Sequence, residues 1–246
     1  MNEKVNFGLT KVLKTKKTKL VSDIFSSVSN KYDLMNDAMS LGLHRLWKER
    51  MYVVSKLKKS DNALDLATGT GDIALKFLSK RKSIKITCLD ENQEMLDICK
   101  DRLVDNGFVK DVLFIKSSAE NAKLEENQYT LATIAFGFRN FTDHSKALKN
   151  IYNSLMPGGR LIIMEFSTPK NKLVKNVFEK YTHNIIPRIG KIIADDYDSY
   201  RYLAESISTY FSPEEVTDLY REAGFIKTRY EILLGNMVTI HIGFKC

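Results

Sequence analysis

The segment DLATGTGD, residues 65–72, places two glycines between two carboxylates and precedes a predicted helix. Gly69 and Gly71 allow the backbone to approach a ligand closely, and the following helix offers unpaired N–H groups at its first turn. Asp90 ends the next predicted strand, about 25 residues after Asp65, where a carboxylate binds vicinal ribose hydroxyls in nucleoside-binding folds. A tight turn or a solvated strand-end acid explains either feature alone, but together they favour a nucleoside-type cofactor.

The sign of the charge in this turn favours one such cofactor over another. The spacing alone does not exclude a dinucleotide, because Ala74 stands at the third glycine position of the dinucleotide fingerprint and alanine is tolerated there. A carboxylate at Asp72 would repel a pyrophosphate, whereas Asp65 and Asp72 are compatible with a cofactor that carries an ammonium and a sulfonium group. The sequence therefore favours S-adenosylmethionine.

A third segment, SSAE at residues 117–120, follows a predicted strand at the position of an adenine-binding wall. Ser118 is placed to meet the ring amine, and Ala119 leaves room beside the ring. A plain surface loop explains this segment nearly as well.

The segment AFGFRN, residues 135–140, ends the fourth predicted strand at the sheet edge where open α/β folds bind ligands. We expect Arg139 and Asn140 to polarise an oxygen of an acceptor, with Phe136 and Phe138 framing an apolar ring. The structural alternative for Arg139 is a surface cation or the partner of a carboxylate.

The segment KYDLMNDAMSLGLHRLW, residues 31–47, precedes the first core strand and combines aromatic, amide and acidic side chains. Its Met, Leu and Trp residues recur at helical spacing, and this stripe predicts core packing. Its polar face is placed to close the acceptor side of the pocket with the side chains of Tyr32, Asp33, Asn36 and His44.

The elements that position these residues alternate between strands and helices after residue 60. We expect strands at the start of 62–72 and over 83–90, 111–120, 130–140 and 160–167. We expect helices over 73–80, 92–107 and 143–156, the last stopped by Pro157-Gly158-Gly159. This alternation predicts an α/β fold with a mostly parallel sheet and helices on both faces.

The two ends of the chain differ from this core. Helices predicted around 171–184, 199–207 and 213–223 precede two strands over 225–233 and 237–244, whose short link predicts an antiparallel hairpin at the sheet edge. At the other end, lysines crowd the first twenty residues with weak periodicity, and helices follow around 20–30 and 34–58 with a break at Gly42. We expect one domain over 1–246, composed of a basic arm and helical cap over 1–58 and a core over 59–246 with a helical insertion at about 171–207.

Composition excludes several classes of protein. A chain of 246 residues with 43% hydrophobic residues buries a substantial core. Three widely spaced cysteines and four scattered histidines give no disulfide frame and predict no metal site. An apolar run near the ~18 residues of a membrane span and a signal peptide are both missing, which predicts a cytoplasmic protein, soluble or peripheral at the inner face of the membrane.

The net charge of +8 suggests anionic partners such as a membrane surface or a nucleic acid, or simply a lysine-rich composition. The interleaving of arginine and aromatic residues that marks nucleic-acid modules is missing, so we expect no nucleic-acid partner.

Several of these segments together resemble one family. YDLMNDAMSLGLHRLW at 32–47 with PGGRLIIMEFS at 157–167 resembles the ubiquinone/menaquinone biosynthesis C-methyltransferases, which are class I S-adenosylmethionine-dependent enzymes. FGFRN at 136–140 and the run IPRIGKIIADDYDSYRYLAESI at 186–207 strengthen the similarity. It extends from about residue 20 to the end of the chain.

The resemblance implies a Rossmann-like seven-stranded sheet and methylation of a ring carbon of a polyprenylated benzoquinol or naphthoquinol. The residues that it implies for the cofactor are Gly69, Thr70, Gly71, Asp90, Ser118 and Ala119, beside Asp65 and Ala135 in the same strand ends. Those that it implies for the acceptor are Tyr32, Arg139 and Asn140. Many relatives carry Ser at the position of Ala135, so one cofactor hydrogen bond is missing here or is replaced by water.

The implied chemistry requires a reduced quinol, whose deprotonated hydroxyl directs electron density to the ortho carbon. Arg139 would stabilise the phenolate, and Tyr32 or a water held by Arg139 and Asn140 would accept the proton, with His44 as a weaker candidate. Expected partners are the polyprenyl quinol, a membrane surface contacted with help from the basic arm, and a homodimer or a quinone-biosynthesis complex. The alternatives are methylation of another phenolic or lipid acceptor, methylation of a nucleic acid, and a nucleotide-binding module without catalysis.

Overall fold

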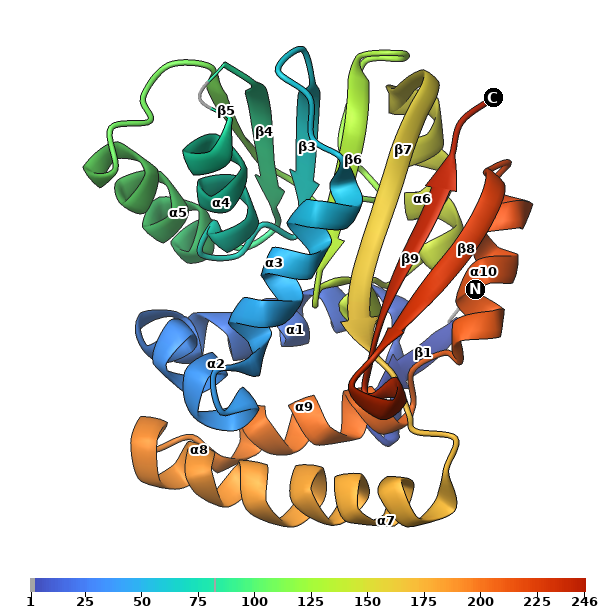
Figure 1. The fold of residues 1–246 in the computed structure, drawn as a ribbon. Coiled ribbons are helices and arrows are strands. Elements are labelled where there is room, and N and C mark those ends of the chain that lie inside the picture. Colours follow the sequence, from blue (N-terminus) through green and yellow to red (C-terminus); the bar gives the residue numbers. More distant parts are fainter. Residues whose placement is uncertain (1–2, 82) are drawn as a thin grey trace.

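A twisted sheet of seven strands runs through the computed structural model, which describes residues 3–81 and 83–246 apart from the side chains of Asn30, Tyr32 and Asp33. The strand order is β5-β4-β3-β6-β7-β9-β8 (Figure 1). The parallel strands are β3 (Asn62–Leu66), β4 (Lys85–Asp90), β5 (Val112–Lys116), β6 (Tyr129–Ala135) and β7 (Leu155–Phe166). At the edge, β8 (Ile226–Leu233) and β9 (Val238–Phe244) form the predicted antiparallel hairpin.

The order of the strands reverses between β3 and β6. The chain first builds β3, β4 and β5 outward in one direction and then places β6 on the other side of β3. Adjacent loops therefore leave the carboxyl ends of β3 and β6 in opposite directions and open a crevice, which is where open α/β sheets bind ligands. The glycine turn follows β3, and Phe136 to Asn140 follow β6, so both predicted site segments meet at this crevice.

Helices cover both faces of the sheet, as predicted, because the central strands are buried on both sides. On one face, α6 (His144–Ser154) and α10 (Pro213–Glu222) pack against Leu64, Leu66 and Ile134. On the other face, α3 (Leu43–Ser55), α4 (Asp72–Lys80) and α5 (Gln93–Asp105) pack against Ala63 and Ile86.

Residues 3–20 are more ordered than their weak periodicity suggests. They form a hairpin of β1 (Lys4–Phe7) and β2 (Thr10–Leu13), and α1 (Lys14–Val28) begins six residues before the predicted helix. Phe7 stacks on Tyr202 with ring centroids 4.4 Å apart. Lys14 forms an ion pair with Asp143 at 2.9 Å. The prediction of a weakly structured arm was wrong because these partners lie far away in sequence.

The predicted break at Gly42 is confirmed. Gly42 has a φ of +77° between α2 (Tyr32–Ser40) and α3, in the left-handed region that favours glycine. A short 3-10 turn, Ser29–Lys31, joins α1 to α2.

Two predicted boundaries in the second half of the chain were wrong. Helix α6 ends at Ser154, and Pro157-Gly158-Gly159 lie inside β7 rather than before it. The reason is pairing with the chain end: Gly158 N donates to Lys245 O and Lys245 N donates to Gly159 O, each at 2.9 Å.

The second wrong boundary lies after residue 184, where the chain continues as helix. Helix α7 (Lys172–Lys180) passes through a π turn, Tyr181–Ile185, into α8 (Ile186–Ala194), and α9 (Tyr197–Ser208) follows. Pro187 lies in the first turn of α8, where the missing N–H costs no hydrogen bond. The helices α1, α2, α7, α8 and α9 gather below the carboxyl edge of the parallel strands (Figure 1).

Candidate active site

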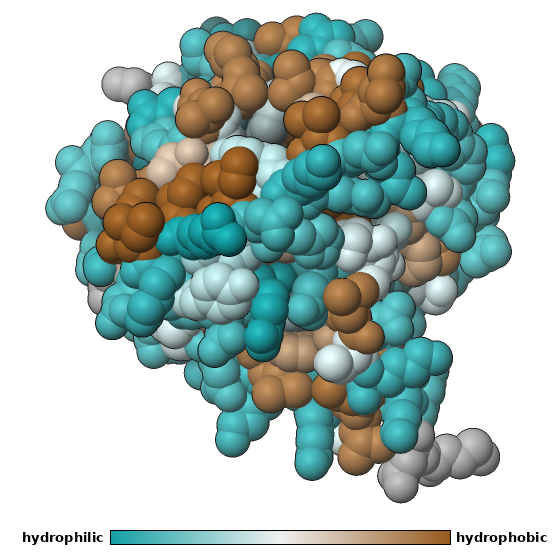
Figure 2. All heavy atoms as spheres, turned by 90° about the horizontal axis from the view of Figure 1, so that it is seen from below, coloured by the Kyte–Doolittle hydropathy of each residue, from teal (hydrophilic) through white to brown (hydrophobic). Residues whose placement is uncertain are grey.

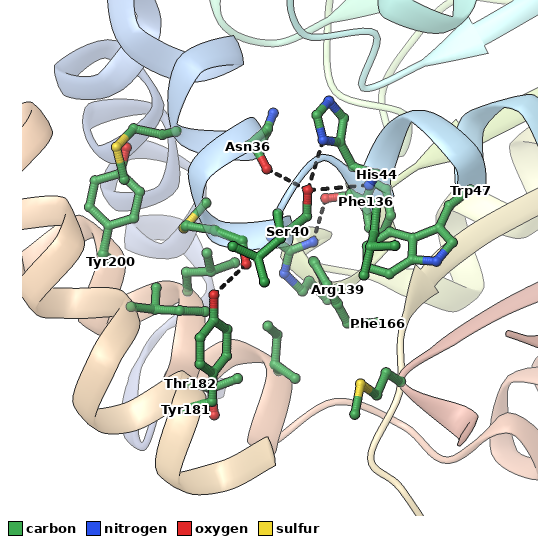
Figure 3. Close-up of a pocket in the computed structure, with 18 of the residues that line it drawn as sticks. Asn36, Ser40, His44, Trp47, Phe136, Arg139, Phe166, Tyr181, Thr182 and Tyr200 are labelled. Carbon is green, nitrogen blue, oxygen red and sulfur yellow. Dashed lines mark hydrogen bonds between the residues drawn. The ribbon is translucent and has the colours of Figure 1, made fainter. Parts of the chain in front are cut away.

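Three neighbouring cavities lie between this helical cap and the sheet. A cofactor-side cavity of about 70 Å³ lies over the ends of β3 and β4 and extends toward residues 118–120. A small pocket of about 30 Å³ lies beside the glycine turn. An acceptor cavity of about 330 Å³ opens under the cap helices (Figure 3). Phe136 lines all three, so they adjoin one another around its ring.

The glycine turn and Asp90 come into direct contact in the wall of the cofactor-side cavity. Gly69 N donates to Asp90 Oδ2 at 2.9 Å, and Asn92 N donates to Asp90 Oδ1 at 2.9 Å. Burial raises the pKa of the Asp90 carboxyl. Both carboxylate oxygens accept backbone hydrogen bonds and keep further lone pairs, which suits a carboxylate that binds two adjacent hydroxyl groups.

Asp65 lies inside β3 at the floor of the small pocket. Its oxygens accept hydrogen bonds from the hydroxyls of Thr68 and Thr133, each at 2.6 Å. Burial raises the pKa of Asp65 to about 6, although these two hydroxyl bonds and the charge of Lys48 act in the opposite direction. Thr70 lines the same pocket.

Asp72 begins α4 and is held by two cations. Lys48 Nζ donates to Asp72 Oδ2, and Arg102 Nη1 lies 2.6 Å from Oδ1. Burial acts to raise the pKa of Asp72, but the two cations outweigh it and the pKa lies below its ordinary value. The sequence predicted that the charge of Asp72 faces the ligand. In the structure, Lys48 and Arg102 already neutralise this charge within the protein.

Ser118 and Ala119 line the cofactor-side cavity together with two acidic side chains that the sequence argument missed. Glu91 is largely buried, and this burial, with Glu120 and Asp90 nearby, raises its pKa to about 7. Ser118 Oγ accepts a hydrogen bond from Asn121 at 3.0 Å.

Helix α1 covers this cavity with Val21, Ser22 and Phe25. Asn92 Nδ2 donates to Ser22 O at 3.0 Å and to Ser26 Oγ at 2.9 Å, which fixes the helix over Asp90. The sequence did not predict this wall. Asn92 and its partners in α1 are about seventy residues apart, and no recognisable motif links them.

Arg139 lies at the inner end of the acceptor cavity (Figure 3). It forms an ion pair with Glu165. Nη1 lies 2.8 Å from Glu165 Oε1, and Nε donates to Ser206 Oγ at 3.3 Å. The Arg139 side chain is 6% exposed and Glu165 is fully buried. Within the described chain Nη2 has no hydrogen-bond partner, so the guanidinium keeps donors for an acceptor oxygen while Glu165 fixes its orientation.

Asn140 follows Arg139 directly but lines the cofactor-side cavity. Its Oδ1 accepts a hydrogen bond from Tyr202 at 3.1 Å, and its buried Nδ2 has no hydrogen-bond partner among the described residues. An unsatisfied buried donor is costly, so this Nδ2 is available to an acceptor atom of a ligand in the cavity. The structure thus separates two neighbours that the sequence placed on the same ligand.

The acceptor cavity is mostly apolar, and His44 is one of its polar residues. His44 Nδ1 lies 2.8 Å from Ser40 Oγ, as Figure 3 shows. Burial and the nearby charge of Lys48 lower the pKa of His44, which favours the neutral imidazole. Tyr32 begins α2 next to this cavity, but its side chain lies outside the described residues, as does that of Asp33.

Comparison with known proteins places this arrangement in a family. The sequence model of the ubiE/COQ5 methyltransferase family matches residues 11–245. The chain belongs to this family. It is 40% identical to the ubiquinone/menaquinone biosynthesis C-methyltransferase UbiE of Idiomarina loihiensis, over 99% of this chain and 97% of that protein. It is 42% identical to UbiE of a Marinomonas species, over 98% and 96% of the two chains.

Solved structures support the fold of this methyltransferase. An S-adenosylmethionine-dependent methyltransferase from Aquifex aeolicus superposes with a TM-score of 0.60 at 18% identity, over 96% of this chain and all of that one. Phosphoethanolamine N-methyltransferase 2 of Haemonchus contortus, solved with S-adenosylmethionine, gives a TM-score of 0.58 at 13% identity, over 81% of this chain and 52% of that one. The class I methyltransferase fold predicted from the sequence is confirmed.

Among the described residues, none of the helices is long and apolar enough to span a membrane. In the same part of the chain, His, Cys, Asp and Glu side chains form no group able to hold a metal ion.

The two glycines of the turn differ in what surrounds them, and this difference predicts two different mutant phenotypes. Gly71 has a φ of +83°, and a Cβ there would lie 2.5 Å from Cys99 Sγ. Gly69 has a φ of +55°, and a Cβ there meets no atom within 4 Å because it points into the cavities.

We therefore expect Gly71→Ala to lower the free energy of unfolding by about 2–4 kcal/mol, through left-handed strain and overpacking. Gly69→Ala costs only about 1–2 kcal/mol of strain, but its methyl group reduces the affinity for S-adenosylmethionine. Urea denaturation and titration calorimetry of both variants measure the two effects. Wild-type affinity in Gly69→Ala would show that no ligand approaches this position.

Proposed function

We propose that this methyltransferase transfers the methyl group of S-adenosylmethionine to a ring carbon of a polyprenylated quinol in ubiquinone or menaquinone biosynthesis. The names of its UbiE relatives support this reaction. The observation that carries it is the pair of adjoining cavities around Phe136. One is lined by carboxylates and amides, and the other is apolar with a buried arginine at its inner end.

The cofactor-side residues fit S-adenosylmethionine. Asp90 is placed for the ribose hydroxyls, Ser118 and Ala119 for the adenine, and the unpartnered Nδ2 of Asn140 for an acceptor atom of the ligand. The rest of S-adenosylmethionine would lie on the turn after β3, which contains Gly69, Thr70 and Gly71 and follows Asp65. Ala135 lines both the cofactor-side cavity and the small pocket at this turn. When bound, this molecule supplies an electrophilic methyl group on a sulfonium.

The acceptor-side residues fit a quinol that has lost a proton. A quinone ring carbon is itself electrophilic, so the acceptor must be reduced, and loss of a hydroxyl proton makes the ortho carbon nucleophilic. Arg139 stabilises the phenolate through the donors that Glu165 leaves unused, and it is pre-oriented because this ion pair is buried. The apolar cavity wall excludes water and holds the ring against Phe136.

The proton leaves to a base in the cavity wall. Because Arg139 and Asn140 line different cavities, the candidates are Tyr32 and a water molecule held by Arg139 alone. His44 lines the same cavity, and as a neutral imidazole it is able to accept a proton.

Methyl transfer to defined acceptors tests the reaction. Purified protein with labelled S-adenosylmethionine is expected to methylate reduced demethylmenaquinol or 2-polyprenyl-6-methoxy-1,4-benzoquinol on carbon, and not the oxidised quinones. Simple phenols and RNA serve as comparison acceptors. Faster methyl transfer to a phenol or to RNA would show that the quinol is not the substrate. Binding of S-adenosylmethionine without transfer to any acceptor would indicate a nucleotide-binding module.

The role of Arg139 predicts a kinetic signature. We expect Arg139→Gln to lower kcat by roughly 100-fold or more, since it removes electrostatic stabilisation of the phenolate, with little change in the affinity for S-adenosylmethionine. Because the single change leaves Glu165 buried without its cation, the double variant Arg139→Gln/Glu165→Gln removes both charges and is measured alongside it.

Arg201→Gln is the matched control, because it removes a guanidinium from an exposed side chain that lines none of the three cavities. Wild-type turnover in the folded double variant would contradict the role of Arg139.

The acceptor side also supports a contact with a membrane surface, from which a long-tailed quinol would enter. Four exposed apolar side chains define an apolar rim around the acceptor cavity: Leu41, Leu173, Val177 and Ile192. Leu41 and Val177 also line the cavity itself. Figure 2 shows this face from below, with apolar side chains between hydrophilic ones.

The charge around this rim suits an anionic bilayer. Residues 172–195 carry five basic residues against two acidic ones. In the basic arm, by contrast, two lysines are engaged by the protein itself: the partly exposed Lys14 pairs with Asp143, and the buried Lys17 Nζ donates to Phe141 O at 2.8 Å. We therefore assign the membrane contact to α7 and α8 rather than to the arm.

Vesicle binding tests this assignment. We expect Leu173→Ser/Val177→Ser/Ile192→Ser to weaken cosedimentation with phosphatidylglycerol-containing vesicles and to raise KM for a long-tailed quinol but not for a short-tailed one. Val109→Ser, at a side chain that is 68% exposed away from the cap, is the control. Unchanged vesicle binding of the triple variant would exclude this surface.

A further inference from the structure

Lys48 is a buried lysine at the junction of the small pocket and the acceptor cavity. It extends from α3, and its side chain is 9% exposed. Burying an ammonium group is costly unless negative groups compensate it. Lys48 forms an ion pair with Asp72, but Asp72 also pairs with Arg102, so one carboxylate serves two cations.

The pocket beside Lys48 continues the proposed cofactor site. Ala67, Gly69, Ala135 and Phe136 line both the small pocket and the cofactor-side cavity. A nucleoside whose ribose lies at Asp90 therefore directs its other end past Gly69 into the small pocket. At about 30 Å³ this pocket is the smallest of the three cavities, which suits the end of the ligand that carries no ring.

The charges around this pocket match an amino-acid head group. Asp65 and Asp72 are acidic, and among the described residues that line the pocket Lys48 carries the only positive charge. Arg102 approaches from behind, where it holds Asp72 and donates to Thr70 O at 3.5 Å. An α-amino acid carries one ammonium and one carboxylate, so it presents an opposite charge to each kind of side chain in this wall.

We propose that Lys48 binds the carboxylate of the amino-acid end of S-adenosylmethionine, while Asp65 and Asp72 face its ammonium group. The assignment rests on the proposed function, because it takes this molecule as the ligand of the neighbouring cavity. When Lys48 turns from Asp72 toward the ligand carboxylate, Arg102 stays paired with Asp72. No carboxylate is therefore left unpaired.

This role connects the cap with the cofactor. Lys48 belongs to α3, whose Trp47 and His44 line the acceptor cavity, and the Trp47 ring centroid lies 6.0 Å from that of Phe136. A carboxylate held by Lys48 therefore fixes the helix that forms one wall of the acceptor cavity. Lys48 is thus a positioning residue, which orients the cofactor and helix α3 and takes no part in the methyl transfer.

Two ligands that differ by one carboxylate test the proposal. Titration calorimetry measures binding of S-adenosylhomocysteine and of its decarboxylated analogue, 5′-deoxy-5′-(3-aminopropylthio)adenosine. We expect the wild-type protein to prefer the former by roughly 10- to 100-fold, the range of a charge-assisted hydrogen bond. Lys48→Met should lose this preference: its affinity for S-adenosylhomocysteine falls, while its affinity for the analogue changes less than about twofold. Lys48→Arg should restore part of the preference.

Lys76→Met is the matched control. Lys76 Nζ lies 2.8 Å from Glu49 Oε2, so this ion pair also joins α4 to α3, but it lies outside the three cavities. We expect this variant to keep the wild-type preference. Lys48→Gln, measured with the same two ligands, replaces Lys48→Met if that variant does not fold.

Two results would overturn the assignment of Lys48. One is a folded Lys48 variant that keeps the full preference for S-adenosylhomocysteine, and the other is an equal loss of affinity for both ligands. Failure of the wild-type protein to bind either S-adenosylhomocysteine or S-adenosylmethionine would instead overturn the proposed function, and the role of Lys48 with it.

Discussion

The close approach of two loops at the reversal of strand order is the constraint on which the site depends. A Cβ at Gly137 would lie 2.5 Å from the Cβ of Ala67, so the loops after β3 and β6 touch where only a glycine fits. The flanking residues are held in the left-handed region, Ala67 at a φ of +48° and Phe136 at +59°. Such strain persists where the surroundings fix it, and here it brings the Phe136 ring to the point where three cavities adjoin.

The buried ion pair of Arg139 and Glu165 fixes the charged groups at this same place. A buried ion pair adds little stability, because desolvation offsets the attraction between its members. It does fix direction: Glu165 also accepts hydrogen bonds from the backbone N–H groups of Arg139, at 3.2 Å, and Phe166, at 2.9 Å. The carboxylate at the end of β7 thus holds both the side chain and the loop that carries it, which leaves the guanidinium pre-oriented toward the acceptor cavity.

Sequence predicted the parts of this site that depend on strand ends. Parallel strands finish at one edge, so finding the strands sufficed to bring Gly69, Asp90 and Arg139 to one crevice. It did not predict the separation of Arg139 from Asn140, which depends on one 3-10 turn after β6. It also missed Lys48 and Glu165, since an ion pair across the fold leaves no local pattern. The sequence also did not predict helix α8. A π turn joins it to α7 just before Pro187, and no local pattern reveals such a turn.

The cap differs from the core in what holds it together. In the core, a large apolar cluster on each face of the sheet combines side chains from strands and helices, many of them fully buried. In the cap, Val28, Met35, Ile186 and Tyr200 form a smaller cluster surrounded by partly buried residues, and all four also line the acceptor cavity. Helices from the two ends of the sequence therefore pack around an apolar space rather than a filled centre. We expect an apolar ligand to complete that packing, because it would bury the side chains that line the cavity. Polar bonds such as those of Lys48 and Asn92 join the cap to the sheet side.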